Sequence, residues 1–407
     1  MKKRLLILAM ATAVALSSCK KKGPDDPPEP EEIKLEYSNL SVEVHKKNLE
    51  KNGTDFLALI NTLPDEKFID VLKYFIELDK NVPTYTAPFG SLFTIYEAAQ
   101  GENIASVFEA AKTPNARNLS EFFAVYTWDP TEKKWIKTAS ANKLEIKFPA
   151  DKNSKTNNAV LSFAYTASGI VSTFDGQKYT LPTSYVASLT VDNKEEMKLT
   201  SNHTYKADGN PTKADINVMM GSFNMAVLVT SDVKKVNSSL TLTKGKTSLL
   251  NLKNEANGNA DINNAINATK INGILDNANT SFEIMNVRLA GVVDSKSVTT
   301  EYDALGNLSD EAKNKKKAEI LNKYAEVYAA YKTENKIIAK VSFESIAETY
   351  TSSYWNGTDF VPETYIDYSI EPRLVFNDKS KVSLKAFTET GFSKLITDFE
   401  NYGKRFE

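Results

Sequence analysis

The feature that most restricts the fold is a period-two alternation of apolar and polar residues, running from about residue 122 to residue 258. Apolar side chains occupy every second position within short segments, as in Phe223–Val229. Such alternation places apolar side chains on one face of a strand and polar ones on the other. Turn-forming residues separate the segments, at Asp192-Asn193, Asp208-Gly209, Gly221 and Lys244-Gly245. Short strands joined by short turns predict an antiparallel meander over residues 122–258, with one solvated face.

Helical periodicity flanks this meander. Pro64, Asp65 and Glu66 form a favourable helix start, because proline suits the first turn and acids suit the positive end of the helix dipole. An apolar stripe at helical spacing follows, formed by Phe68, Val71, Leu72, Phe75 and Leu78. We therefore expect a helical region over residues 54–112. A second helical region is expected over residues 259–335, where Ser309 is a good N-cap and an apolar stripe continues to Tyr331.

The last part of the chain, residues 336–407, is expected to contain strands and a terminal amphipathic helix. Blocks of helices and strands that alternate along the chain predict the α+β class. The expected architecture is a large curved antiparallel β-sheet (a meander) with N-terminal and C-terminal helices packed on its apolar face. No linker-like composition interrupts residues 35–407, so we expect one composite domain there.

The first nineteen residues predict export. A basic cluster, Lys2–Arg4, precedes an apolar run that is too short to span a bilayer core, which takes about 20 residues. The segment Leu16–Cys19 then resembles the lipobox of bacterial lipoproteins. This resemblance implies cleavage after residue 18 and attachment of lipid to Cys19. An ordinary signal cut elsewhere, or an uncleaved anchor, is the alternative.

Cys19 is the only cysteine of the chain, so no intramolecular disulfide can form. Residues 19–34 read as a lipid anchor and a tether rich in proline and acids, which would reach roughly 40 Å when extended. Lys20 directly after the cysteine resembles lipoproteins delivered to the outer membrane. Lysines followed by acids resemble the export tag of Bacteroidetes surface lipoproteins. These resemblances imply a protein anchored in the outer membrane, either surface-exposed or facing the periplasm.

Candidate catalytic groups are scarce. His45 lies in a polar stretch and is expected to be solvated, whereas His203 lies on an apolar strand face and is expected to be a hydrogen-bonded core residue. No zinc-like cluster, phosphate loop or nucleophile motif is present, and a calcium-like run near Asn254 lacks the required pattern. Removing residues 1–18 takes away three cations, which makes the net charge −5 instead of −2 and argues against nucleic acid. We therefore expect no enzyme activity, metal or cofactor, although spacing alone does not decide against paired carboxylates for glycoside hydrolysis.

Two aromatic hairpins are the candidate binding residues: Trp128 with Trp135, and Tyr354 with Trp355. Exposed tryptophan and tyrosine rings can stack on sugars, but the same residues are often cross-strand packing pairs. We expect a non-catalytic binding protein for a glycan or an apolar ligand such as a lipid. The alternative is a structural or interaction lipoprotein that docks another envelope protein. A deep cavity lined by aromatic residues and amides would favour a ligand, whereas a large exposed apolar patch would favour docking.

Overall fold

The computed structural model describes residues 35–80, 123–174, 177–259, 274–355, 357–389 and 392–404. The contacts divide the chain into two compact units. Unit 1 takes the described parts of residues 1–60, 230–241 and 248–407, and unit 2 takes those of residues 61–229 and 242–247. Each of these units has its own apolar core, and the single composite domain expected over residues 35–407 stays a prediction.

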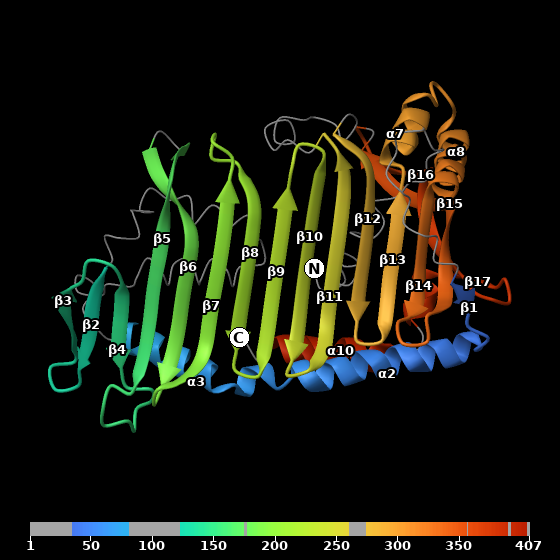
Figure 1. Cartoon of the computed structure of the whole chain (residues 1–407). Coiled ribbons are helices and arrows are strands. Elements are labelled where there is room, and N and C mark those ends of the chain that lie inside the picture. The colour runs from blue at the N-terminus through green and yellow to red at the C-terminus, as the bar shows by residue number, and fades with distance from the viewer. Residues whose placement is uncertain are drawn as a thin grey trace. The chain divides into compact units, whose positions relative to one another are not determined.

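Unit 2 is built on a largely antiparallel sheet. β2 (Ala124–Asp129) pairs antiparallel with β3 (Lys134–Ala139) and parallel with β4 (Leu144–Phe148). Long antiparallel strands follow, side by side in Figure 1: β5 (Ala159–Phe174), β6 (Gln177–Val191), β7 (Lys194–Tyr205) and β8 (Pro211–Met220). The division between the units falls within β9 (Phe223–Ser231) and β10 (Lys235–Lys244). The antiparallel sheet expected from the alternation is confirmed, except that β2 and β4 are parallel.

The turn between β6 and β7 shows why this pattern could be read from the sequence. Asp192 and Asn193 adopt φ angles of 51° and 64°, in the left-handed region that favours Asn and Asp. Two such residues form the tight turn whose twist suits a hairpin. Local turn chemistry and alternation therefore agree at this position.

The helix α3 (Lys67–Lys80) contributes to the core of unit 2, directly after the short 3-10 turn η1 (Leu63–Asp65). Four residues of the expected stripe are buried, namely Phe68, Val71, Phe75 and Leu78, and the fifth, Leu72, is partly buried. The ring of Phe75 lies 5.0 Å from that of Phe148 in β4, measured between centroids. Ile146, Leu189 and Val191 complete the centre of the same cluster.

Unit 1 begins with β1 (Glu36–Tyr37) and α2 (Val42–Ile60). Its antiparallel strands are β11 (Thr247–Gly258), β12 (Leu275–Ile284), β13 (Val287–Val293), β14 (Ala325–Tyr331), β15 (Lys336–Trp355), β16 (Phe360–Val375) and β17 (Lys381–Ser383). Each of these strands pairs with the next, and β1 is parallel to β15. The helices α7 (Ser295–Asp303), α8 (Asp310–Tyr324), α9 (Leu384–Glu389) and α10 (Ser393–Gly403) complete the unit. Among the described strands, the sheet is not closed.

The helical region expected over residues 259–335 is only partly helical where the structure describes it, because α7 and α8 follow two strands, β12 and β13. The Ser309 cap is present, since its Oγ accepts a hydrogen bond from the backbone of Ala312 at 3.3 Å. However, α8 ends at Tyr324, and residues 325–331 form β14 between β13 and β15. Val327 and Ala329–Tyr331 are buried, and pairing on both edges of this strand outweighed the helical spacing of the stripe. The part of the other expected helical region from residue 81 to residue 112 lies outside the described residues.

His45 is a second correction, because it is buried in unit 1 and not solvated. α2 places His45 towards the core, where it is 1% exposed, and leaves Glu43 and Lys47 in solvent. Its Nδ1 lies 2.8 Å from the Tyr331 hydroxyl, and its ring stacks near Phe376. Burial lowers the pKa of His45 below its ordinary value. Polar neighbours in the sequence were misleading because they occupy the opposite side of the helix.

Candidate functional site

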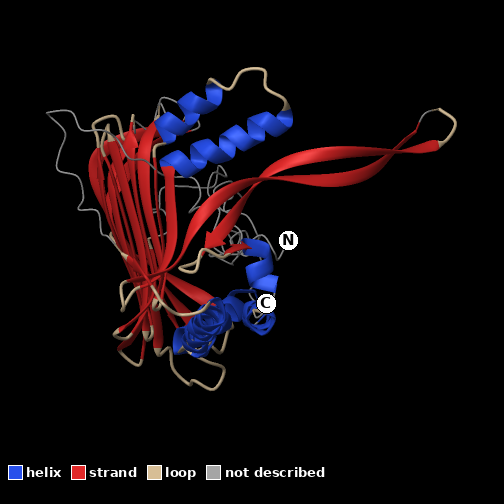
Figure 2. Cartoon of the chain, turned by 90° about the vertical axis from the view of Figure 1, so that its right-hand side faces the viewer, coloured by secondary structure: helices blue, strands red, loops and turns tan. Residues whose placement is uncertain are grey.

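The candidate site is the outer part of a two-stranded ribbon in unit 1. β15 and β16 pair in continuous register from Lys340–Val375 to Trp355–Phe360. At the base, β14 and β1 lie beside β15 at residues 336–340, and β17 lies beside β16 at residues 373–375. α8 also lies against β15 and β16 near Phe343, and beyond that contact the ribbon extends away from the other elements of unit 1 (Figure 2). We call its outer part, Ser345–Trp355 with Phe360–Ile370, the arm.

The arm has two chemically different faces. Side chains alternate between the faces along a strand, and cross-strand partners share a face. One face carries the pairs Glu348–Asp367, Tyr350–Tyr365 and Ser352–Glu363, and we call it the acidic face. The other carries the pairs Thr349–Ile366, Thr351–Thr364, Ser353–Pro362 and Trp355–Phe360, and we call it the uncharged face.

Large side chains are exposed on both faces. On the uncharged face, Trp355, Phe360 and Ile366 are 57%, 71% and 54% exposed, and the Trp355 and Phe360 ring centroids lie 5.2 Å apart. On the acidic face, Tyr350 stacks on Tyr365 with 5.6 Å between centroids. Single exposed apolar residues are ordinary, whereas several large ones on one ribbon favour an interaction surface.

The charged residues of the ribbon from Val341 to Pro372 are all acidic. This stretch has six acids and no Lys or Arg, although the whole chain has 50 of these cations. At the base the acids are paired: Glu344 lies 2.7 Å from Lys381, and Glu371 lies 2.8 Å from Arg373. Within the described residues, the acidic-face carboxylates Glu348, Glu363 and Asp367 have no cation within salt-bridge distance. The Tyr350 hydroxyl donates a hydrogen bond to Glu348, and this contact raises the pKa of Tyr350.

The first aromatic hairpin, in unit 2, lies in a different environment. Trp128 in β2 is 6% exposed and belongs to the core of unit 2, where its carbonyl accepts a hydrogen bond from Asn157 at 2.8 Å. Trp135 in β3 is its cross-strand partner, with 5.1 Å between ring centroids. The ring of Phe75 in α3 meets Trp135 edge-on at 6.0 Å. These contacts leave Trp128 little surface for a ligand.

Tyr354 and Cys19 are the remaining residues predicted from the sequence to belong to a site. Tyr354 pairs with Val361 in the arm, next to the Trp355–Phe360 pair. The structure therefore brings Tyr354 and Trp355 together in the arm, and Trp128 and Trp135 together in unit 2. Cys19 and the tether over residues 19–34 lie outside the described residues. Sequence reasoning missed Ile366 and the acidic face, and the cation-free stretch from Val341 to Pro372 was the signal that could have revealed them.

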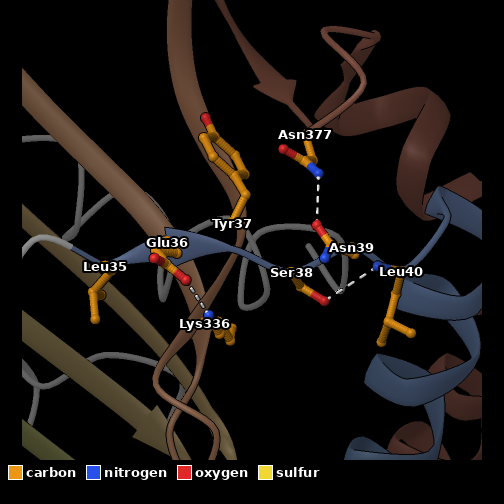
Figure 3. Close-up of a pocket in the computed structure, with 8 residues that line it drawn as sticks. All are labelled: Leu35, Glu36, Tyr37, Ser38, Asn39, Leu40, Lys336 and Asn377. Carbon is orange, nitrogen blue, oxygen red and sulfur yellow. Dashed lines mark hydrogen bonds and ion pairs between the residues drawn. The ribbon is translucent and has the colours of Figure 1, made fainter.

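Two depressions occur near the start of unit 1, and both are open to solvent. The larger, of about 590 Å³, is lined by Leu35–Leu40, Lys336 and Asn377 (Figure 3). Lys336 donates a hydrogen bond to Glu36 at 2.5 Å, which lowers the pKa of that carboxyl, and Asn377 donates one to Asn39 at 3.2 Å. The smaller, of about 360 Å³, lies among Asn48, Asn52, Asn286 and Tyr331. Neither depression contains a tryptophan.

Buried acids elsewhere in unit 1 are held by cations. Glu283 is 6% exposed and lies 2.7 Å from Arg288 and 2.8 Å from Lys332. Burial acts to raise its pKa, but the hydrogen bonds from Lys332, Arg288 and Asn251 outweigh burial and hold the pKa below its usual value. This arrangement keeps Glu283 ionised as a structural group. In the part of the chain that the structure describes, no three His, Cys, Asp or Glu residues converge as a metal site.

Comparison with known proteins gives no match to a family model, to a curated protein or to a solved structure. Among the described helices, none is both long and apolar enough to cross a bilayer. The arm, its two faces and their chemistry are therefore the basis for the functional argument.

Proposed function

We propose that this chain is a non-catalytic, lipid-anchored envelope protein that docks another envelope protein through the β15–β16 arm. The observation that carries the proposal is the exposed aromatic and apolar surface of the arm, with Trp355, Phe360 and Ile366 each more than half exposed. An isolated two-stranded ribbon is only marginally stable in water, so a long one with large exposed side chains is best explained by a partner that completes it.

The described depressions support docking more than capture of a small molecule. Ligand sites usually bury most of the ligand in a concave, largely apolar pocket. The two depressions are open, and Leu35–Leu40, Asn48 and Asn52 give them a mixed or polar lining. The walls of the two depressions offer little enclosed apolar surface. The arm, by contrast, exposes large apolar and aromatic side chains to solvent.

Capture of a glycan by the arm is the second candidate. Trp355 and Phe360 present exposed rings next to the hydroxyl groups of Ser353 and Thr351, which is chemistry that suits stacking on a sugar. A glycan array probed with wild-type protein and with Trp355→Ala would test it. Binding that disappears in the variant supports capture; an array with no Trp355-dependent signal removes this candidate.

The anchor is part of the same proposal. Lipid on Cys19 would hold the chain at the outer membrane, surface-exposed or facing the periplasm. Each buried lipid CH₂ contributes about 0.8 kcal/mol, so several acyl chains give a stable attachment. The tether over residues 20–33, at about 3.1 Å per residue when extended, would let the docking surface work roughly 40 Å from the bilayer.

We also propose that helices cover the apolar face of the sheet in each unit. The supporting contacts are those of Phe75 in α3 with Phe148 in β4, and the packing of Val42 and Leu49 in α2 against the cluster around Ile338. Covered apolar faces would leave the arm as a surface free to bind a partner. This arrangement would limit nonspecific association through the sheets.

Site-specific photo-crosslinking in the intact envelope tests the docking role. A photoreactive residue at Ile366 is compared with one at Val233, because both positions are 54% exposed but only Ile366 lies on the arm. We expect Ile366 to give one dominant crosslinked protein and Val233 to give none. Equal crosslinking from both positions, or no product from Ile366, would contradict docking through the arm.

A further inference from the structure

One contact of β15 shows which of its residues direct their backbone N–H and C=O groups away from β16. Phe343 lies where α8 meets β15, and the side-chain amide of Asn322 bonds to its backbone on the outer side. Asn322 Nδ2 donates to the Phe343 carbonyl at 2.7 Å, and its Oδ1 accepts from the Phe343 N–H at 2.8 Å. The cross-strand partner of Phe343 is Pro372, which has no N–H to donate. The Asn322 side chain therefore acts in place of a neighbouring strand at this one position.

Every second residue of β15 after Phe343 has the same outward backbone direction, because the register has no shift between Phe343 and Trp355. Opposed residues in an antiparallel pair alternate between exchanging backbone hydrogen bonds and pointing their polar groups outward. Five residues of β15 therefore point their N–H and C=O groups outward, namely Ser345, Ala347, Thr349, Thr351 and Ser353. None of the described strands pairs with them on that side.

The outer edge of β16 is different, because proline interrupts it. Pro362 and Pro372 fall on the outward-pointing positions of β16, as the partners of Ser353 and Phe343. Proline on an edge strand removes donors and blocks the addition of another strand. Pro362 thus interrupts the β16 edge near the tip and Pro372 interrupts it at the base, whereas the β15 edge from Ser345 to Ser353, beyond the contact of α8 with Phe343, contains no proline.

We propose that this β15 edge is an acceptor site for an extended protein segment that adds to the arm as a further strand. The proposal rests on the docking function and specifies the chemistry of its partner. Main-chain hydrogen bonds supply affinity in strand addition, and alternate side chains supply specificity. The added strand would place its side chains beside Glu348 and Tyr350 on the acidic face, and beside Thr349 and Thr351 on the uncharged face.

The charges favour a cationic partner segment. Glu348, Glu363 and Asp367 share the acidic face without a nearby cation in the described structure, so Lys or Arg at alternate positions of the added strand would be attracted. Tyr350 and Tyr365 add exposed ring faces, on which a cation can rest. A second copy of the arm would instead place acids beside acids. We therefore assign the partner as a segment with alternating basic and apolar or hydroxyl residues.

Synthetic peptides test the edge and its charge preference on the purified full chain. The probe is a peptide of about nine residues, matching the length of the Ser345–Ser353 edge, with Lys alternating with Val or Thr. Its controls are the same peptide with Glu for Lys, and the Lys peptide N-methylated along its pairing edge. We expect calorimetry to detect the Lys peptide and to show at least about tenfold weaker binding for both controls.

Two proline variants at one cross-strand pair give a matched test. Thr351→Pro removes an outward N–H from the β15 edge, whereas Thr364→Pro removes one from the opposite, β16 edge, next to Pro362 on that edge. We expect Thr351→Pro to weaken the Lys peptide about tenfold and Thr364→Pro to leave it nearly unchanged, with circular dichroism confirming that both fold. Unchanged binding in Thr351→Pro, or equal binding of Lys and Glu peptides, would overturn the inference. If the Ile366 crosslink persists in Thr351→Pro, docking stands without the edge; if that crosslink is absent from wild type, docking itself has failed.

Discussion

Trp128 and Trp355 show how residues with the same sequence context can take opposite roles. Each precedes a turn and faces an aromatic partner across a hairpin: Trp135 for one and Phe360 for the other. The cross-strand pairs were visible in the sequence. Their burial was not, because it depends on Phe75 of α3 packing against Trp135, a contact between residues far apart in the chain.

Alanine at these two positions should therefore have different effects. Trp128→Ala should lower the free energy of unfolding by about 3–5 kcal/mol, because a large buried ring is removed from the core. Trp355→Ala should cost less than about 1 kcal/mol, because only an exposed cross-strand pair is lost. Urea denaturation measures both values. A larger cost for Trp355→Ala than for Trp128→Ala would contradict the assignment of core and surface.

His45 should make stability depend on pH in a defined window. An unfolded histidine has a pKa of about 6.5, and burial lowers the pKa of His45 in the fold. Between those values the unfolded chain binds more protons, so the stabilisation is complete above about pH 6.5 and is lost as the pH falls below it. We expect His45→Gln to be less stable at pH 7.5 but to lose less stability on acidification, by up to about 1.4 kcal/mol per pH unit.

His203→Gln is the control for that experiment. Burial also lowers the pKa of His203, but its side chain is only half-buried, beside Ser201. Its substitution should flatten the pH dependence less than His45→Gln does. Urea midpoints measured from pH 7.5 to pH 5.5 give the dependence of stability on pH for each protein. A dependence in His45→Gln as steep as in the wild type would contradict the role assigned to His45.

At the scale of elements, strands with strong alternation and local turn residues could be predicted, and strands fixed by distant pairing could not. Asp192 and Asn193 marked a turn that the structure contains. By contrast, the segment from Tyr324 to Tyr331 fits helical spacing, yet it becomes β14 because β13 and β15 pair on both of its edges. The outward edge of β15 was also beyond sequence reasoning, since it is identified by the contact of Asn322 with Phe343.

Hydrogen exchange of the arm amides in the isolated protein tests which backbone N–H groups of β15 point toward β16 and which point outward. Glu348, Tyr350 and Ser352 should donate to β16 and exchange slowly, whereas Thr349, Thr351 and Ser353 should exchange at least about tenfold faster. Residue-resolved NMR gives these rates. Equal protection of both sets would show that another segment covers the edge, and the reverse order would show that the register is different.

At the scale of the whole molecule, the first nineteen residues make the most direct prediction. Cys19→Ala should prevent attachment of lipid, so the variant should leave the membrane fraction and appear in the soluble envelope fraction or the medium. Intact mass of the wild-type chain should show cleavage after residue 18 and a mass increase for lipid. A variant that stays in the membrane fraction, together with a wild-type mass without lipid, would contradict the anchor.

The central claim is that the arm joins this protein to a partner. The size of the particle that contains this protein, measured after gentle solubilisation of the envelope, tests this claim most directly. A variant that lacks residues 347–368, with the cut ends joined by a tight Asn-Gly turn, removes the exposed aromatic residues and leaves the apolar cores of both units intact. Sedimentation velocity should show the wild-type chain in a larger complex and the shortened variant as a single chain, at equal abundance in the membrane fraction. Identical sedimentation of the two proteins would contradict the claim.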